Sequence, residues 1–174
     1  MSLAVIALLV VGLGLIAWIS ARVRAMAFAA PGQPRPHSLP SQHGWYVALW
    51  TVVPALLFLI VWDNISGGLI YGQVMASPEA QALPGFGLQR AAILNEAYAL
   101  ATGASTTAFN REAFTLAPVY AQAISFYTWI GFAVAMLLAF AAGAWAFSRM
   151  SPNFRARTPV EPLVMGTLLR ASLT

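Results

Sequence analysis

The sequence contains no cysteine and no lysine, and only 8% of its 174 residues are charged. The lack of cysteine excludes disulfides, thiolate metal sites and cysteine nucleophiles. The scarcity of charge excludes an ordinary soluble domain, in which about a quarter of the residues are charged. The nine basic residues are all arginines that lie beside apolar segments and form no basic stripe. We therefore expect no nucleic-acid partner.

Catalytic motifs are missing as well. No HExxH, GxSxG or phosphate-loop pattern occurs, and the lone GxG at Gly85-Phe86-Gly87 has no strand before it. His37 and His43 lie six residues apart without a carboxylate or thiol nearby, which does not indicate a metal site. We expect a protein that is not an enzyme, with no catalytic residue, cofactor or metal.

Three long apolar runs dominate the sequence, and hydrophobic residues make up 60% of it. A helix of about 20 apolar residues crosses the hydrocarbon core of a bilayer, because internal hydrogen bonds satisfy its backbone there. The runs predict membrane spans at about residues 3–21, 45–62 and 122–147. The expected fold is an all-α integral membrane protein with three transmembrane helices, forming one membrane domain over residues 1–174.

The first span is not flanked like a signal peptide. No basic residue precedes it, whereas Arg22 and Arg24 follow it. A signal peptide has the opposite arrangement, so we expect an uncleaved span, although Ala27-Phe28-Ala29 resembles a cleavage site.

The arginines near the spans predict an orientation, because basic residues are enriched in cytoplasmic loops. Seven follow the first or third span, and only two lie between the second and third: Arg22, Arg24, Arg35, Arg149, Arg155, Arg157 and Arg170 against Arg90 and Arg111. We expect a periplasmic N-terminus, an extracytoplasmic segment at 63–121 and a cytoplasmic tail at 149–174.

The second span has aromatic residues at its ends, with Trp45, Tyr46 and Trp50 at the start and Trp62 at the end. Such rings favour the membrane interface and are predicted interface anchors. Pro54 lies inside this span and cannot donate to the carbonyl of Trp50, which predicts a bend. The hydroxyl of Thr51 is the expected partner of that carbonyl.

Short helices are predicted between the second and third spans. Ser77-Pro78-Glu79 has the residues of a helix start, with serine as the cap and proline at the first position. Apolar residues at helical spacing predict a second helix from Leu88 to Thr102, with Gly103 as its stop. A further short helix is expected from Asn110 to Leu116, before Pro118.

Small residues recur every four positions in the third span, at Gly131, Ala135, Ala139 and Gly143. Such a stripe allows two helix backbones to approach closely, and close packing holds helices together in lipid. The stripe predicts a helix-packing face, used either for a partner or for self-packing. The alternative is that these residues reflect only the high alanine content of an apolar helix.

Two segments resemble a known family. RPHSLPSQHGWYVALWTVVPALLFLIVW, at residues 35–62, resembles the start of the N-terminal extension of bacterial phosphate ABC transporter permeases of the PstC type. SPNFRARTPVE, at residues 151–161, resembles the segment that ends this extension. The resemblance implies a multi-pass protein of the bacterial inner membrane that takes part in phosphate uptake.

Permeases of this family continue with further spans and a helix that docks on the ATPase subunit. The present sequence stops at Thr174, so no residue of that transport core is carried over. We expect a non-catalytic membrane subunit or domain that packs against the permease core, with membrane lipid and other transmembrane subunits as partners. The alternative is a free-standing accessory subunit of a respiratory or photosynthetic complex.

The orientation is testable with single cysteines, because the natural chain has none. Cysteine at Ser41 lies in the expected cytoplasmic loop, and cysteine at Ser105 lies in the expected periplasmic segment. In intact spheroplasts an impermeant thiol reagent should label Ser105→Cys and leave Ser41→Cys unlabelled. The reverse labelling would refute the orientation.

Overall fold

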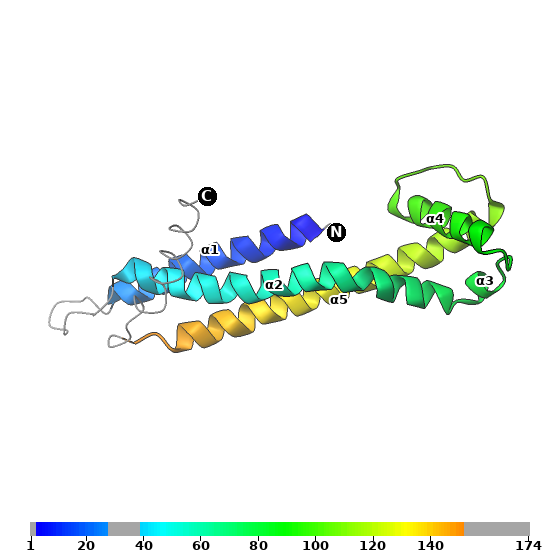
Figure 1. Cartoon of the computed structure of the whole chain (residues 1–174). Helices are drawn as coiled ribbons and strands as arrows, with labels where there is room; N and C mark the ends of the chain where they lie inside the picture. The colour runs from blue at the N-terminus through cyan, green and yellow to red at the C-terminus, as the bar shows by residue number, and fades with distance from the viewer. Residues whose placement is uncertain (1–2, 28–38, 152–174) are drawn as a thin grey trace, which may run out of the picture. The chain divides into compact units, whose positions relative to one another are not determined.

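A computed structural model describes residues 3–27 and 39–151 of the chain (Figure 1). These residues form helices and no strand, namely α1 (Leu3–Ala27), α2 (Pro40–Met75), α3 (Pro78–Gln81), α4 (Gly87–Thr102) and α5 (Arg111–Ser148). Helices α1, α2 and α5 are each long and apolar enough to cross a membrane. The expected all-α membrane fold with three transmembrane helices is therefore confirmed.

Helices α2 and α5 are longer than the apolar runs that predicted them. They contain 36 and 38 residues, which correspond to about 54 and 57 Å of helix at 1.5 Å per residue. A bilayer core is only about 30 Å thick. Each helix therefore continues well beyond the part that can cross the hydrocarbon, and the expected spans 45–62 and 122–147 lie inside them.

The two prolines do not interrupt these helices. Pro54 lies within α2, and Pro118 lies within α5. The expectation of a separate short helix at 110–116 is therefore wrong, because α5 runs through Pro118 from Arg111. A proline inside a helix removes one hydrogen bond, to the residue four positions earlier. For Pro118 that residue is Phe114.

Thr51 does not serve the carbonyl of Trp50 as expected. Its hydroxyl donates to the carbonyl of Val47 at 2.8 Å, four residues earlier in α2. The threonine side chain reaches the carbonyl one turn back, as threonines in helices commonly do.

The sequence predicts one membrane domain over 1–174, whereas the chain groups into two compact units. The three-helix unit lies within Met1–Ile60 and Ala133–Thr174 and contains α1, the first part of α2 and the last part of α5. The hairpin unit is Val61–Phe132 and contains the rest of α2 and α5 together with α3 and α4. Because α2 and α5 each pass through both units, the division falls inside helices and no linker marks it.

The hairpin unit has an apolar core of its own. Side chains from all four of its helices are buried together, namely Val74, Ala80, Leu83, Ile93, Leu94, Ala97, Ala113, Leu116, Tyr120 and Ala123. Burial of such side chains stabilises the folded state by roughly 1.5–3 kcal/mol for each large one. The short helices α3 and α4 are therefore held on the α2–α5 hairpin by apolar packing.

The ends of the short helices follow the sequence signals. The Ser77 side chain accepts a hydrogen bond from the backbone N–H of Ala80, and Pro78 opens α3. Gly103 ends α4 in the left-handed conformation, with φ of 74°. Both predicted helix boundaries are confirmed, because each depends on local backbone chemistry alone.

Candidate functional site

The predicted stripe of small residues on α5 is buried throughout its length. Ala135 and Ala139 have no exposed surface, and Gly131 and Gly143 are buried as well. Residues four apart lie one above another on a helix, so the stripe is a continuous seam.

Helix α2 covers the two glycines of this seam, one in each unit. In the hairpin unit, a Cβ atom at Gly131 would meet the indole of Trp62. In the three-helix unit, a Cβ at Gly143 would lie 2.5 Å from Oγ1 of Thr51. At these two positions glycine leaves room for side chains of α2 to lie against the backbone of α5.

Two further glycines let α1 approach α2, and sequence reasoning missed both. A Cβ atom at Gly14 would meet Cγ2 of Val52, and one at Gly44 would lie 3.1 Å from the backbone carbonyl oxygen of Trp18. A backbone atom cannot rotate away, so Gly44 has the least room for substitution. The two glycines belong to different helices, so no long stripe of small residues along one helix revealed them.

The predicted interface anchors divide into two kinds. Trp45 and Trp50 are 56% and 41% exposed, as a residue in contact with lipid headgroups would be. Tyr46 is buried in a core with Ala21, Ala25 and Val47. Trp62 donates its indole N–H to the carbonyl of Tyr127 at 3.3 Å. Tyr46 and Trp62 therefore pack against the protein, and their role as anchors remains a prediction.

Arginines stack on aromatic rings at one end of the three-helix unit. The guanidinium carbon lies 5.2 Å from the ring centre for Arg22 on Trp18, 4.5 Å for Arg24 on Phe147 and 5.3 Å for Arg149 on Trp145. Such pairs contribute about 0.5–1 kcal/mol at exposed sites. Arg24 also donates to the carbonyl of Phe147 at 3.4 Å, so the C-terminal ends of α1 and α5 meet.

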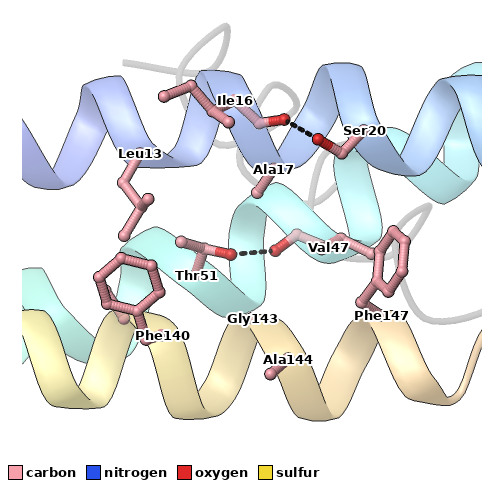
Figure 2. Close-up of a pocket in the computed structure, with 11 residues that line it drawn as sticks. Leu13, Ile16, Ala17, Ser20, Val47, Thr51, Phe140, Gly143, Ala144 and Phe147 are labelled. Carbon is pink, nitrogen blue, oxygen red and sulfur yellow. Dashed lines mark hydrogen bonds between the residues drawn. The ribbon is translucent and has the colours of Figure 1, made fainter.

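An apolar groove of about 300 Å³ lies in the three-helix unit, between α1 and α5 and over α2 (Figure 2). Its walls come from all three helices: Leu13, Ile16, Ala17, Ser20, Val47, Thr51, Ala139, Phe140, Gly143, Ala144 and Phe147. Figure 2 shows Leu13 and Ala17 extending from α1 toward the space, with Phe140 and Phe147 rising from α5. This groove was not predicted, because the sequence does not show which faces of α1 and α5 remain unpaired.

The hydroxyl groups beside the groove are engaged by their own helices. Ser20 donates to the carbonyl of Ile16 at 2.8 Å, and Thr51 donates to the carbonyl of Val47 at 2.8 Å. Each hydroxyl proton is thereby committed to a helix carbonyl. The groove therefore presents an apolar surface.

Polar contacts in the hairpin unit support the fold. Glu96 accepts a hydrogen bond from the backbone N–H of Asn110 at 2.9 Å, next to the start of α5, where a negative charge is favourable. Arg90 donates to the carbonyl of Ala80 at 3.2 Å and so links α4 to α3. Across residues 3–27 and 39–151, no three histidine, cysteine or acidic side chains come together as metal ligands. His37 lies outside the described residues.

The glycine seam gives a matched pair of substitutions. Alanine at Gly143 would press on Thr51, whose hydroxyl is held by Val47. Alanine at Gly12 of α1 would meet nothing within 4 Å. We expect Gly143→Ala to lower the unfolding free energy in detergent by about 1–3 kcal/mol. Gly12→Ala should be neutral or stabilising, because alanine favours helix over glycine by up to about 1 kcal/mol.

A double-variant cycle identifies the cause. Thr51→Ala removes the Oγ1 atom that a Cβ at Gly143 would strike, so Gly143→Ala should cost much less in the Thr51→Ala background. Thermal unfolding of the unmodified chain, the two single variants and the double variant measures the stability of each. Equal losses for Gly143→Ala with and without Thr51 would show that this contact does not limit the approach of α5 to α2.

Comparison with known proteins identifies a family. A family described as "Phosphate ATP-binding cassette transporter" matches residues 5–174, nearly the whole chain. No curated protein and no solved structure is similar enough to count as a match. The match agrees with the resemblance carried by residues 35–62 and 151–161. This chain, which has three helices long and apolar enough to cross a membrane, therefore belongs to the phosphate ATP-binding cassette transporter family.

Proposed function

We propose that this chain is a non-catalytic membrane component of a phosphate ATP-binding cassette transporter, associated with the permease and acting through helix packing. The observation that carries the proposal is the glycine-mediated packing of α2 against α1 and α5 in a member of this family. Such packing makes a firm scaffold within lipid.

The proposed location is the bacterial inner membrane, with the N-terminus in the periplasm and the tail in the cytoplasm. Arg22 and Arg24 follow the first span, and Arg149 follows the third. The contact between Arg24 and Phe147 brings these two basic segments to the same end of the three-helix unit. That arrangement supports one cytoplasmic side for both segments. Arg35, Arg155, Arg157 and Arg170 lie outside the described residues.

A partner helix would contact faces that α2 leaves open. The small-residue stripe is covered within the chain, so self-packing is the role that we favour for it. Large apolar side chains remain exposed on the other faces of α1 and α5, including Leu8, Leu15, Trp129 and Leu137. A transmembrane partner would replace lipid on such faces, and its small residues and shape would then decide the fit.

Affinity purification tests the association. A tagged copy of the chain, extracted from its native membrane in mild detergent, should bring down the permease, ATPase or binding-protein subunits of a phosphate transporter. Untagged membranes carried through the same steps are the control. Recovery of respiratory or photosynthetic subunits instead would favour the alternative of an accessory subunit in another complex.

Transport by the isolated chain provides a second test. The groove of the three-helix unit is apolar, and the acidic side chains of the described residues all lie in the hairpin unit. We therefore expect liposomes containing only this chain to take up labelled phosphate no faster than empty liposomes. Saturable uptake that depends on the chain would refute the non-catalytic scaffold role.

A further inference from the structure

We propose that the groove between α1 and α5 binds an acyl chain of an anionic phospholipid, with the lipid phosphate at Arg24. The proposal concerns the three-helix unit alone and goes beyond the scaffold role. It rests on the surface and size of the groove and on the charge at its end.

The groove selects an apolar occupant. Apart from the hydroxyls of Ser20 and Thr51, which donate to helix carbonyls, its lining side chains are apolar. A buried water needs two to four polar partners, and this lining offers few. Within a bilayer, such a space is filled by hydrocarbon. The groove runs from Leu13 to Ser20 along α1, and seven residues of helix correspond to about 10 Å. It therefore extends along the direction in which a lipid chain lies.

The width of the occupant favours a lipid chain over a protein helix. An α-helix with its side chains is about 10 Å across. The groove is bordered by side chains of α1 and α5 and floored by α2, and α1 and α5 meet at its Phe147 end, where Arg24 donates to the carbonyl of Phe147. A neighbouring helix could lie over the groove, whereas a single extended hydrocarbon chain is much narrower than a helix.

One end of the groove is basic, which gives the headgroup preference. Phe147 lines the groove, and the guanidinium of Arg24 lies 4.5 Å from the centre of its ring. Arg24 is only partly buried and donates one weak hydrogen bond, at 3.4 Å, to the carbonyl of Phe147. Its guanidinium carries five N–H donors, which suit the oxygen atoms of a phosphate.

No carboxylate lies in the described part of the three-helix unit. Asp63, Glu79, Glu96 and Glu112 all belong to the hairpin unit, and the remaining acid, Glu161, lies outside the described residues. The arginines in the described part of the three-helix unit are Arg22, Arg24 and Arg149, and no acidic residue lies there. Basic pockets between transmembrane helices are established sites for anionic lipid headgroups.

Native mass spectrometry of the full chain, titrated with phosphatidylglycerol or phosphatidylcholine of identical chains, tests the proposal. The unmodified chain should bind phosphatidylglycerol in preference. Arg24→Gln should weaken phosphatidylglycerol binding about fivefold, which corresponds to about 1 kcal/mol for one arginine near a membrane surface. Arg24→Lys should retain most of the binding. Arg22→Gln is the matched control, because Arg22 stacks on Trp18, which does not line the groove.

A second pair of variants tests the acyl chain. Ala144 is exposed and lines the groove, so Ala144→Leu should obstruct it and weaken phosphatidylglycerol binding. Ala133→Leu adds the same bulk at an exposed position of α5 that does not line the groove, and it should leave binding unchanged. Thermal unfolding of each variant shows whether the fold is intact. Excess inorganic phosphate should not displace the lipid.

Five results would overturn the proposal. Equal binding of the two lipids, or equal losses for Arg24→Gln and Arg22→Gln, would exclude a headgroup site at Arg24. Equal binding by the Ala144→Leu and Ala133→Leu chains would exclude the groove. Displacement by inorganic phosphate would indicate a simple anion site. Loss of the bound lipid when transporter subunits join the chain would identify a protein as the occupant.

Discussion

The close approach of α2 to its neighbours is the constraint on which the rest of the structure depends. Lipid tails are as apolar as leucine, so helices in a bilayer gain little by hiding apolar side chains from their surroundings. Close packing must supply the stability, and it requires small residues. Gly14 and Gly44 provide room for it between α1 and α2, whereas Gly131 and Gly143 of α5 leave room for the side chains of Trp62 and Thr51 of α2. Helix α2 is therefore the element that both other long helices share.

The same arrangement explains the groove. Because α1 and α5 both pack on α2, the faces that they turn toward each other are not closed by glycine contacts. Leu13 and Ala17 on one side and Phe140 and Phe147 on the other border an apolar space in place of a packed interface (Figure 2). Arg24 contacts Phe147 at its end, where α1 and α5 do meet. A lipid chain in the groove would complete the packing that the protein leaves open.

Sequence reasoning succeeded where the controlling chemistry is local. The apolar runs identified the three long helices, and Ser77 and Gly103 marked helix ends through hydrogen bonding and backbone conformation. It failed where contacts with neighbouring elements determine the structure. Pro118 was expected to stop a helix, but α5 continues through it into the third span. The stripe on α5 was visible from its spacing, yet nothing in that spacing indicated that Trp62 and Thr51 of α2 cover its glycines. Gly44 is far from the other glycines of α2, Gly67, Gly68 and Gly72, and carried no signal.

The buried stripe changes where a partner should be sought. A small-residue seam is often treated as an interface between proteins, but here one side chain added at Gly143 would strike Thr51 before it met any other subunit. Substitutions along the seam therefore disturb the chain's own fold first, and any loss of a partner would follow indirectly. Leu15 on α1 and Leu137 on α5 are each more than half exposed, so substitutions there are free of this ambiguity. A scaffold that satisfies its closest packing internally can present these faces to lipid or to a transporter subunit without refolding.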